Sequence, residues 1–232
     1  PSAFYNLMES TNNSEVSLNL RYIIFGGEAL FPKHIEKWYI QYPDVKFINM
    51  YGITETTVHV TYKEIDKYDI DSNISNIGNC IPTLSVYILN DFKKLQPVGV
   101  VGELYVSGKG LARGYLNRPE LTDQKFVGNP FIAGERMYSS WDLARWLPDG
   151  NIEYIGRKDD QVKIRGHRIE IGEIESKLNL LPDIKRAIVL ASNHLKGETQ
   201  LVAYLQPNGT KRDAKFIRQQ LEELLPYFMI PS

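Results

Sequence analysis

Charged and apolar residues are interleaved in one unusual stretch of this sequence, residues 156–175, which reads GRKDDQVKIRGHRIEIGEIE. Ten of its twenty residues are charged, yet apolar residues recur at alternate positions on both sides of Gly166. Alternation of this kind is typical of half-buried strands, and glycine is typical of a tight turn between them. The stretch therefore predicts a strand, a turn, a second strand and then a helix that opens near Gly172.

Positive charge gathers around this predicted turn, from Arg157, Lys163, Arg165, His167 and Arg168. Most charge runs on hairpins form a solvated face and carry no chemistry. The alternative is a cationic loop that meets a phosphate group. The residues by themselves leave both interpretations open.

The stretch resembles the eighth core motif of the adenylation domains of non-ribosomal peptide synthetases. These domains belong to the adenylate-forming superfamily, together with acyl-CoA synthetases and luciferases. Three further segments resemble motifs of the same family in the family's order: the fifth (NMYGITETT, 49–57), the sixth (GELYVSGKGLARGYL, 102–116) and the ninth (LPYFMIP, 225–231). The resemblance covers nearly the whole chain.

The resemblance implies a cytoplasmic, ATP-dependent ligase of peptide antibiotic biosynthesis. Such an enzyme joins an amino acid to ATP, forming an aminoacyl-AMP, and passes the acyl group to a thiol. The implied cofactors are ATP, Mg²⁺ and the phosphopantetheine of a partner carrier protein. The implied partners are the amino acid, a peptidyl carrier protein and neighbouring synthetase domains.

Three residues of the fifth motif are candidates for nucleotide and metal binding. Tyr51 follows an apolar strand, and the family places an adenine-stacking tyrosine there; a Tyr-Gly pair elsewhere is more often a plain turn. Glu55 offers hard carboxylate oxygens that suit Mg²⁺ near a polyphosphate, or it stabilises the first turn of a helix. Thr54 could cap that helix or bond a phosphate of ATP.

Asp142 and Arg157 are the candidates for binding the ribose. The resemblance implies that Asp142 binds both ribose hydroxyls, since two acceptor oxygens suit a vicinal diol. Arg157 follows Asp142 at the spacing at which the family places a second ribose-contacting residue. The alternative is that Arg157 is a surface charge at the end of a strand. The sequence departs from the family here, because Ser139, Ser140 and Trp141 replace Arg, Thr and Gly. This departure predicts weakened or altered nucleotide binding, since glycine permits a turn that tryptophan resists.

Five positions correspond to the family's substrate pocket: Ile24, Gly26, Met50, Val58 and His59. Their order resembles the second half of the pocket signature for threonine. A hydrogen bond from His59 to a side-chain hydroxyl would reject analogues that lack one. The alternative is that Ile24 and Val58 are ordinary core residues and that His59 is a satisfied buried histidine.

Other positions receive structural or mechanical roles. GKGLARG (108–114) has neither the spacing nor the context of a phosphate loop, so we assign it to turns and packing. The resemblance implies a hinge at Asp159 and a place for Gly166 along the approach of the thiol. No catalytic residue is assigned with certainty, because the family's lysine is absent from these 232 residues.

The predicted fold is α/β and α+β. Residues 1–158 correspond to the C-terminal part of the adenylate-forming core domain, with a βαβ piece (1–74) and a small distorted β-barrel (75–158). Residues 159–232 correspond to a small, mobile and truncated α+β domain. Both chain ends look cut, so we expect a C-terminal fragment that is inactive alone.

Composition narrows the classes of function. With 43% hydrophobic and 24% charged residues, the chain suits one or two soluble domains. A net charge of −1 favours neither nucleic acid nor a membrane surface as partner. One cysteine excludes an internal disulfide framework. Two alternatives stay open: an acyl-CoA synthetase-like ligase, and a non-catalytic adenylation remnant that serves as a scaffold.

Overall fold

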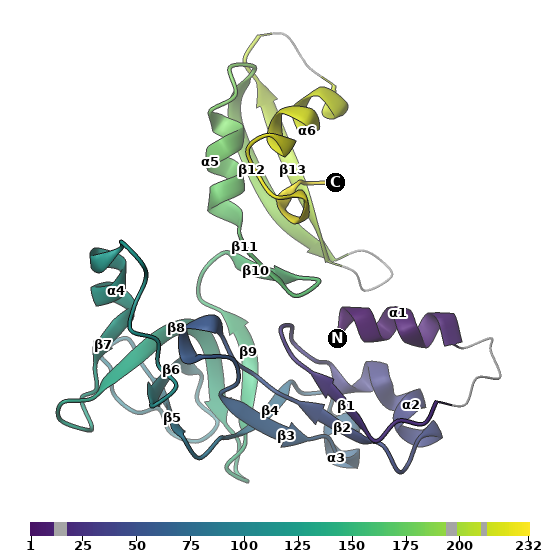
Figure 1. The fold of residues 1–232 in the computed structure, drawn as a ribbon, viewed down its shortest axis with the longest axis vertical. Coiled ribbons are helices and arrows are strands. Elements are labelled where there is room, and N and C mark those ends of the chain that lie inside the picture. Colours follow the sequence, from purple (N-terminus) through teal and green to yellow (C-terminus); the bar gives the residue numbers. More distant parts are fainter. Residues whose placement is uncertain (12–17, 194–198, 210–212) are drawn as a thin grey trace. The chain divides into compact units, whose positions relative to one another are not determined.

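The computed structural model describes residues 1–11, 18–193, 199–209 and 213–232 (Figure 1). The backbone divides into two compact units, Pro1–Lys158 and Asp159–Ser232, called here the large unit and the small unit. Each unit has its own hydrophobic core. Within the described residues, no helix has the length and apolar character needed to cross a membrane.

The large unit begins with the predicted βαβ piece. Strand β1 pairs in parallel with β2, with Ile24 opposite Ile48. Pro32 starts the connecting helical segment, where a residue without an N–H group fits the first turn. The elements of this piece are α1 (Ser2–Thr11), β1 (Tyr22–Phe25), the 3-10 helix η1 (Pro32–Ile35), α2 (Glu36–Gln41) and β2 (Lys46–Asn49).

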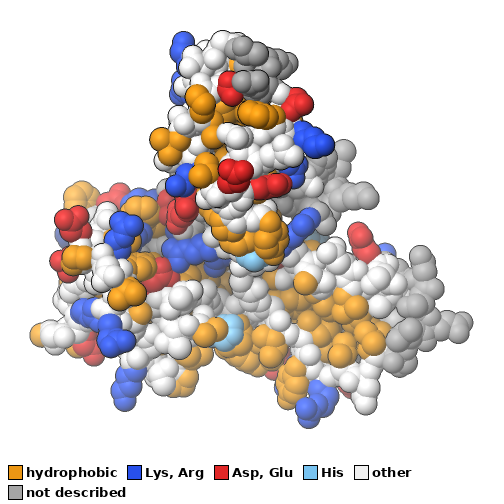
Figure 2. Space-filling model, turned by 45° about the horizontal axis from the view of Figure 1, so that its top comes forward, with side chains coloured by type: hydrophobic (Ala, Val, Ile, Leu, Met, Phe, Trp, Pro, Cys, Tyr) orange, Lys and Arg blue, Asp and Glu red, His pale blue; other side chains and the backbone are white. Residues whose placement is uncertain are grey.

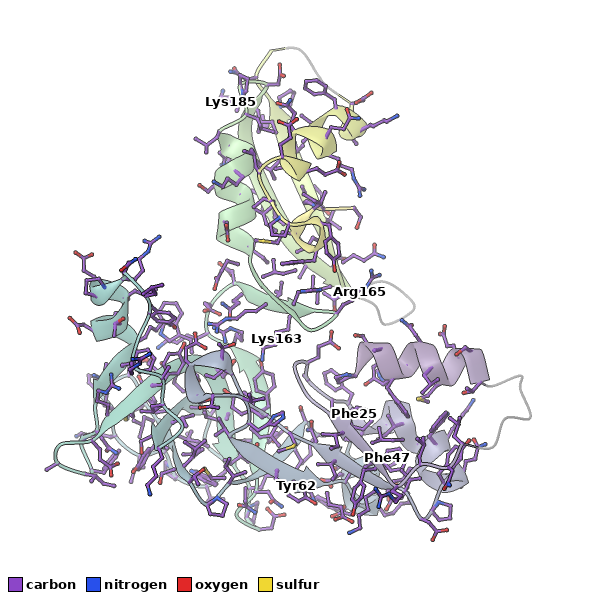
Figure 3. All side chains as sticks on the ribbon, in the orientation of Figure 1. Phe25, Phe47, Tyr62, Lys163, Arg165 and Lys185 are labelled. Carbon is purple, nitrogen blue, oxygen red and sulfur yellow. The ribbon has the colours of Figure 1, made fainter. Side chains whose placement is uncertain are left out.

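Aromatic side chains form the core of this piece. Phe25 of β1 and Phe47 of β2 are almost fully buried, and both are labelled in Figure 3. Phe4 of α1 packs edge-on against Phe25 and Trp38, with ring centroids 5.3 and 5.0 Å apart. Edge-to-face contacts of this kind are favourable for aromatic rings, so they hold α1 and α2 onto the sheet.

The rest of the large unit adds short, mostly antiparallel strands. Its elements are the 3-10 helix η2 (Thr54–Thr56), β3 (Thr61–Glu64), α3 (Lys67–Ser72), β4 (Asn76–Cys80), β5 (Leu84–Leu89), β6 (Gly102–Gly108), α4 (Pro119–Lys125), β7 (Phe126–Gly128), β8 (Arg136–Trp146) and β9 (Ile152–Arg157).

These strands and the βαβ piece share one nine-stranded sheet. Its order is β1-β2-β3-β4-β9-β8-β6-β5, and β7 pairs with β8 beside this path. The path ends at β5, yet Val86 and Ile88 of β5 share a core cluster with Ile77 of β4 and Ile152 of β9. The strands from β4 to β5 therefore share a common core, and the sheet joins the two predicted pieces into one.

The small unit is an α+β arrangement. Its elements are β10 (Gln161–Ile164), β11 (His167–Glu170), α5 (Ile171–Asn179), β12 (Ile184–Asn193), β13 (Thr199–Pro207), α6 (Ala214–Glu222) and the 3-10 helix η3 (Tyr227–Met229). The hairpins β10–β11 and β12–β13 are both antiparallel. The cationic stretch thus forms the predicted hairpin followed by a helix. Helix α6 begins after Asp213, whose side chain caps it by accepting from the Phe216 N–H, 2.7 Å away.

Candidate nucleotide site

The fifth motif forms a tight loop that presents Tyr51. The Tyr51 carbonyl accepts hydrogen bonds from the backbone N–H groups of Val60, at 2.7 Å, and Thr61, at 3.1 Å. Gly52 is required by this closure, because a Cβ there would lie 1.8 Å from the Val58 carbonyl oxygen. This closure therefore fixes the position of Tyr51 just after β2.

Tyr51 and Arg157 bind the same carboxylate. The Tyr51 hydroxyl donates to Oδ2 of Asp142, and Nη1 of Arg157 lies 2.8 Å from Oδ1. Asp142 and Arg157 are directly opposite each other on β8 and β9, so the sheet register sets their contact. Asp142 is fully buried and the other two side chains are nearly so. The structure brings these three predicted residues together.

The protonation of Tyr51 follows from its surroundings. Burial, and then the neighbouring Asp142 carboxylate, raise the pKa of the Tyr51 phenol well above its ordinary value. The phenol consequently stays neutral and acts as a hydrogen-bond donor. Arg157 supplies the compensating charge that a buried carboxylate requires.

This set of groups suits a nucleoside. A carboxylate with two acceptor oxygens matches a vicinal diol, and it stands next to an aromatic ring and a guanidinium. Asp142 already uses one oxygen for Tyr51 and the other for Arg157. A ribose would therefore share or replace these two partners.

Glu55 is held by two phenols that come from different strands and loops. Its Oε1 accepts from the Tyr115 hydroxyl at 2.6 Å and the Tyr138 hydroxyl at 2.9 Å, and the two hydroxyls lie 3.0 Å apart. Burial, followed by the bonds to Glu55 and Tyr138, raises the pKa of Tyr115. Tyr115 was missed by the sequence analysis, and its place in the sixth motif is the only signal that could have found it.

Within the part of the chain that the structure describes, no cage of protein ligands surrounds Glu55. Among the described residues, no three His, Cys, Asp or Glu side chains gather closely enough to hold a metal ion. Mg²⁺ commonly takes one or two carboxylates and completes its shell with water and substrate phosphates. Glu55, buried on η2 beside the exposed Thr54, fits the role of a single carboxylate ligand.

The GKGLARG segment supports the fifth motif through its backbone. The Ala112 N–H donates to the Glu55 carbonyl at 2.8 Å, and the Thr57 hydroxyl donates to the Gly110 carbonyl at 2.7 Å. Gly108 adopts a φ of 114°, where a Cβ would lie 2.6 Å from the Thr83 carbonyl oxygen. The structural assignment of this segment to turns and packing is confirmed.

The turn that departs from the family keeps a backbone suited to glycine. Trp141 has a φ of 61°, in the left-handed region that side chains other than Gly rarely adopt. Ser140 supports the turn, since its hydroxyl donates to the Leu104 carbonyl at 2.5 Å and accepts from the Asp142 N–H at 3.0 Å. Tryptophan therefore strains the turn without preventing it.

The five pocket positions lie at the carboxyl ends of β1 and β2 and in the loop after Gly52. A Cβ on Gly26 would lie 3.5 Å from the Met50 carbonyl oxygen and 3.7 Å from Cε1 of His59. Ile24 and Val58 are 60% and 58% exposed, so the alternative that they are ordinary core residues is wrong. Figure 2 shows hydrophobic side chains exposed on the surface of the protein.

Asp159 and Gly166 belong to the small unit. Asp159 precedes β10, and its carboxylate accepts from the Gln161 N–H at 3.3 Å. Arg165 and Gly166 form the two-residue turn of the β10–β11 hairpin, with φ values of 51° and 79°. Lys163 and Arg165 are labelled on this hairpin in Figure 3.

Comparison with known proteins shows the family to which the chain belongs. The family model described as AMP-binding enzyme matches residues 1–116. The chain is 47% identical over 241 residues to a dimodular nonribosomal peptide synthase of Bacillus subtilis (strain 168), covering 100% of this chain and 10% of that protein. The chain therefore spans about a tenth of such a relative.

Two solved structures share the fold over almost the whole chain. Holo-PA1221, a non-ribosomal peptide synthetase protein that contains adenylation and PCP domains, matches with a TM-score of 0.87 and 26% identity, covering 99% of this chain and 39% of that one. The Vibrio cholerae adenylation domain AlmE, in complex with glycyl-adenosine-5'-phosphate, matches with a TM-score of 0.83 and 28% identity, covering 97% and 43%.

Proposed function

We propose, from the premise that this chain belongs to the AMP-binding enzyme family, that it is part of a non-ribosomal peptide synthetase adenylation domain. In this proposal an amino acid carboxylate attacks the α-phosphorus of ATP, forming aminoacyl-AMP and releasing pyrophosphate. The thiol of a carrier-bound phosphopantetheine then displaces AMP to form a thioester. The 47% identity to a nonribosomal peptide synthase supports this branch of the family.

One observation carries the proposal: Asp142 is held between Tyr51 and Arg157. In the proposed site Asp142 accepts from the ribose hydroxyls, while the Tyr51 ring packs against adenine. Arg157 pairs with the buried carboxylate and provides a second contact to the ribose. A carboxylate fixed before the nucleotide arrives loses less conformational entropy on binding.

Glu55 and Thr54 are proposed for the phosphate side of the site. A bound Mg²⁺ would neutralise charge on the triphosphate, and Glu55 would supply one carboxylate ligand to it. Tyr115 and Tyr138 fix the rotamer of Glu55 through its Oε1 atom. Thr54, exposed on the same 3-10 helix, would donate its hydroxyl to a phosphate oxygen.

The proposed amino acid is L-threonine. Support comes from the pocket sequence and from the positions of Gly26 and His59, which approach each other at the ends of the strands. A His59 hydrogen bond to the threonine hydroxyl would select against 2-aminobutyrate, which has the same carbon skeleton without the hydroxyl. His59→Ala is expected to lower the ratio of the exchange rates with threonine and 2-aminobutyrate more than it lowers the exchange rate with threonine itself.

Thioester formation is proposed to use the small unit. Asp159 would act as the hinge between two half-reactions, and the turn at Gly166 would lie along the approach of the carrier thiol. A structural neighbour that contains both adenylation and PCP domains supports a carrier protein as partner. These roles complete the proposed reaction.

The test uses a synthetase module that carries this chain and its carrier domain. L-Threonine is expected to drive ATP–pyrophosphate exchange faster than any other proteinogenic amino acid. Asp142→Asn should lower exchange about 10- to 100-fold, since hydrogen bonds to a charged group are lost. Asp149→Asn is the matched control, because Asp149 bonds Asn151 at an exposed turn. Equal exchange in the two variants would overturn the assignment of the site.

The two alternatives make different predictions in the same assays. An acyl-CoA synthetase-like ligase would transfer the acyl group to free coenzyme A in preference to the carrier. A non-catalytic scaffold would show no exchange with any amino acid while remaining folded. The preserved left-handed turn at Trp141 weakens the main sequence argument for the scaffold.

A further inference from the structure

The ring of Phe228 stacks directly on the ring of His167. Their centroids lie 4.1 Å apart and their planes differ by 2°. The neighbouring Tyr227 approaches His167 edge-on, with ring centroids 6.0 Å apart. All of these residues belong to the small unit, but they come from two segments about sixty positions apart in sequence. The stack therefore joins the ninth motif to the hairpin of the eighth.

His167 is the first residue after the hairpin turn. Arg165 and Gly166 both have positive φ, and Ile164 pairs with His167 across them. Two-residue turns with this backbone match the twist of the strands and give a well-defined hairpin. The Phe228 ring therefore stacks on the residue that directly follows Gly166.

The other end of the hairpin is held separately. The Gln161 side chain bonds Glu170, and the Arg168 Nε donates to Gln161 Oε1 at 2.7 Å. Ile169 is fully buried in the core of the small unit. These contacts fix the base of the hairpin, whereas an isolated two-stranded hairpin is only marginally stable. The stack on His167 is a further contact that can support the tip.

Phe228 is well placed to give that support because its segment is anchored in the core. Leu225 and Met229 on either side are buried in the core cluster of the small unit, and Phe228 packs against it. The Ser232 N–H also donates to the Leu201 carbonyl of β13 at 2.9 Å. The Phe228 ring therefore presents a fixed surface to His167.

We propose that Phe228 is a positioning residue for the second half-reaction, in which it holds the Arg165–Gly166 turn in place for the incoming thiol. This inference rests on the proposed thioester formation. In this role Phe228 does not contact a substrate. Loss of the stack should loosen the turn and slow thioester formation, while adenylation, whose proposed groups Tyr51, Glu55 and Asp142 belong to the large unit, should be unaffected.

The first experiment measures the stack in the 232-residue protein itself. The ring-current shift of the His167 Hδ2 and Hε1 NMR signals should shrink in Phe228→Leu, where only the edge-on Tyr227 ring remains, and should be retained in Phe228→Tyr. Amide hydrogen exchange of residues 161–170 should quicken in the leucine variant only. Tyr204→Leu is the matched control, since Tyr204 is an exposed aromatic residue on β13 of the same unit. Unchanged His167 signals in Phe228→Leu would overturn the inference.

The second experiment measures the two half-reactions in a module with its carrier domain. Phe228→Leu should lower the rate of carrier loading about three- to tenfold, the range that the loss of one aromatic stack can produce. ATP–pyrophosphate exchange in Phe228→Leu should stay at the wild-type rate. Phe228→Tyr, which keeps the ring, should load the carrier at the wild-type rate.

The outcomes separate the two proposals. A wild-type module without exchange would refute the proposed function, while the NMR result would still decide whether the stack supports the turn. Normal exchange together with normal loading in Phe228→Leu would refute the positioning role alone. Equal loss of exchange and loading would also refute it, since such a loss indicates a general structural defect.

Discussion

The indole ring of Trp141 covers the ammonium group of Lys125, with Nζ 3.2 Å from the ring centroid. Lys125 is buried at the end of α4, so the ring supplies a favourable cation–π partner inside the protein. Trp141 makes this contact from a strained backbone, at a φ of 61°. Asp142 follows directly, and strain and ring packing therefore meet beside the candidate nucleotide site.

These opposing effects predict an unusual order of stabilities at position 141. Trp141→Ala removes the ring but keeps the unfavourable φ, whereas Trp141→Gly removes both. The glycine variant should therefore be more stable than the alanine variant by about 1 kcal/mol, the reverse of the order in a helix. Both should be less stable than the wild type. Urea unfolding followed by far-UV circular dichroism measures these free energies.

Lys125→Met is the companion variant for the ring contact. It keeps an unbranched apolar side chain but removes the charge, and it should lower stability in the wild type more than in Trp141→Gly. If the two backgrounds lose the same free energy of unfolding, the cation–π contact makes no net contribution.

The two phenols on Glu55 should behave as a coupled pair. Tyr115→Phe and Tyr138→Phe each remove one hydrogen bond to the same carboxylate oxygen, at an expected cost of about 1–2 kcal/mol. The double variant should cost more than the sum, because each remaining phenol compensates for the loss of the other. A double-mutant cycle by urea unfolding measures the coupling.

A functional readout accompanies that cycle. If Glu55 is a ligand of Mg²⁺, the double variant should need a higher Mg²⁺ concentration for half-maximal pyrophosphate exchange. An additive cycle together with unchanged Mg²⁺ dependence would show that the phenols do not position Glu55.

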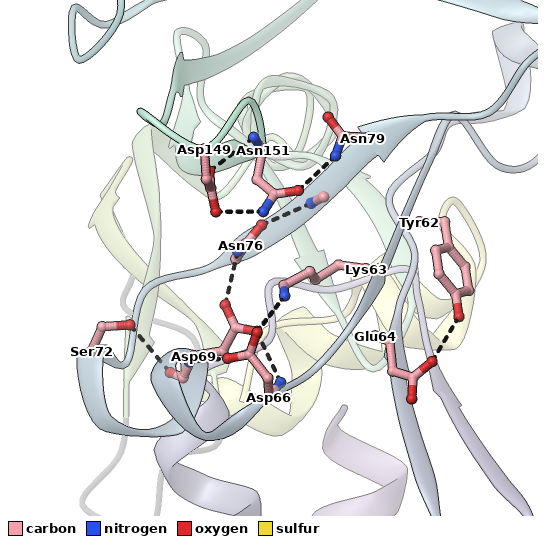
Figure 4. Close-up of polar contacts among 11 residues, drawn as sticks. Tyr62, Lys63, Glu64, Asp66, Asp69, Ser72, Asn76, Asn79, Asp149 and Asn151 are labelled. Carbon is pink, nitrogen blue, oxygen red and sulfur yellow. Dashed lines mark hydrogen bonds and ion pairs between the residues drawn. The ribbon is translucent and has the colours of Figure 1, made fainter.

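A polar network that reaches Asn49, the first residue of the fifth motif, predicts sensitivity to acid (Figure 4). Lys63 Nζ lies 2.9 Å from Asp66 and 3.0 Å from the buried Asp69. The Asn76 amide donates to Asp69 at 2.8 Å, and the Asn49 amide donates to the Asn76 carbonyl at 2.8 Å. The network thereby connects α3 and β3 to the end of β2, immediately before Met50 and Tyr51.

The direction of the pH dependence follows from Asp66 and Lys63. Burial opposes ionisation of Asp66, but bonds from Lys63 and the Asp69 N–H lower its pKa below the ordinary 3.8. A lowered carboxyl pKa stabilises the folded state above about pH 4, and this contribution is lost as the pH falls further. Burial also opposes the charge of Lys63, yet its bonds to Asp66 and Asp69 raise its pKa above 10.5, so its contribution is lost only in strong alkali.

Lys63→Met should therefore flatten the fall in stability between about pH 4 and pH 2. Thermal unfolding across this range measures the slope. Lys46→Met is the control, because Lys46 pairs with Glu64 at 3.2 Å and both side chains are about half exposed. A slope that Lys63→Met leaves unchanged would contradict the role of this network.

Cys80 should be a poor nucleophile in the folded protein. Burial raises the pKa of the Cys80 thiol from 9.0 to about 11. At pH 8 the thiolate fraction should then fall about 100-fold, and alkylation by iodoacetamide should slow accordingly relative to the unfolded chain. The raised pKa also means that stability decreases as the pH rises above about 9. Equal alkylation rates in the folded and unfolded protein would refute this prediction.

Much of the architecture could be predicted because it depends on local patterns. Alternating apolar residues on both sides of Gly166 specify the β10–β11 hairpin, and its two-residue turn needs positive φ. Pro32 marks the beginning of the helix between β1 and β2, and Asp213 marks the beginning of α6. The helix expected near Gly172 begins at Ile171.

The sequence by itself determined which residue types are present and which short elements carry them, from Tyr51 after β2 to Asp142 in β8. Only the tertiary structure decided that these two side chains bond each other across 91 positions. It also decided that Tyr115 joins Glu55 and that Lys125 lies against Trp141. The physical reason is that such contacts depend on sheet register and core packing, which local propensities do not encode.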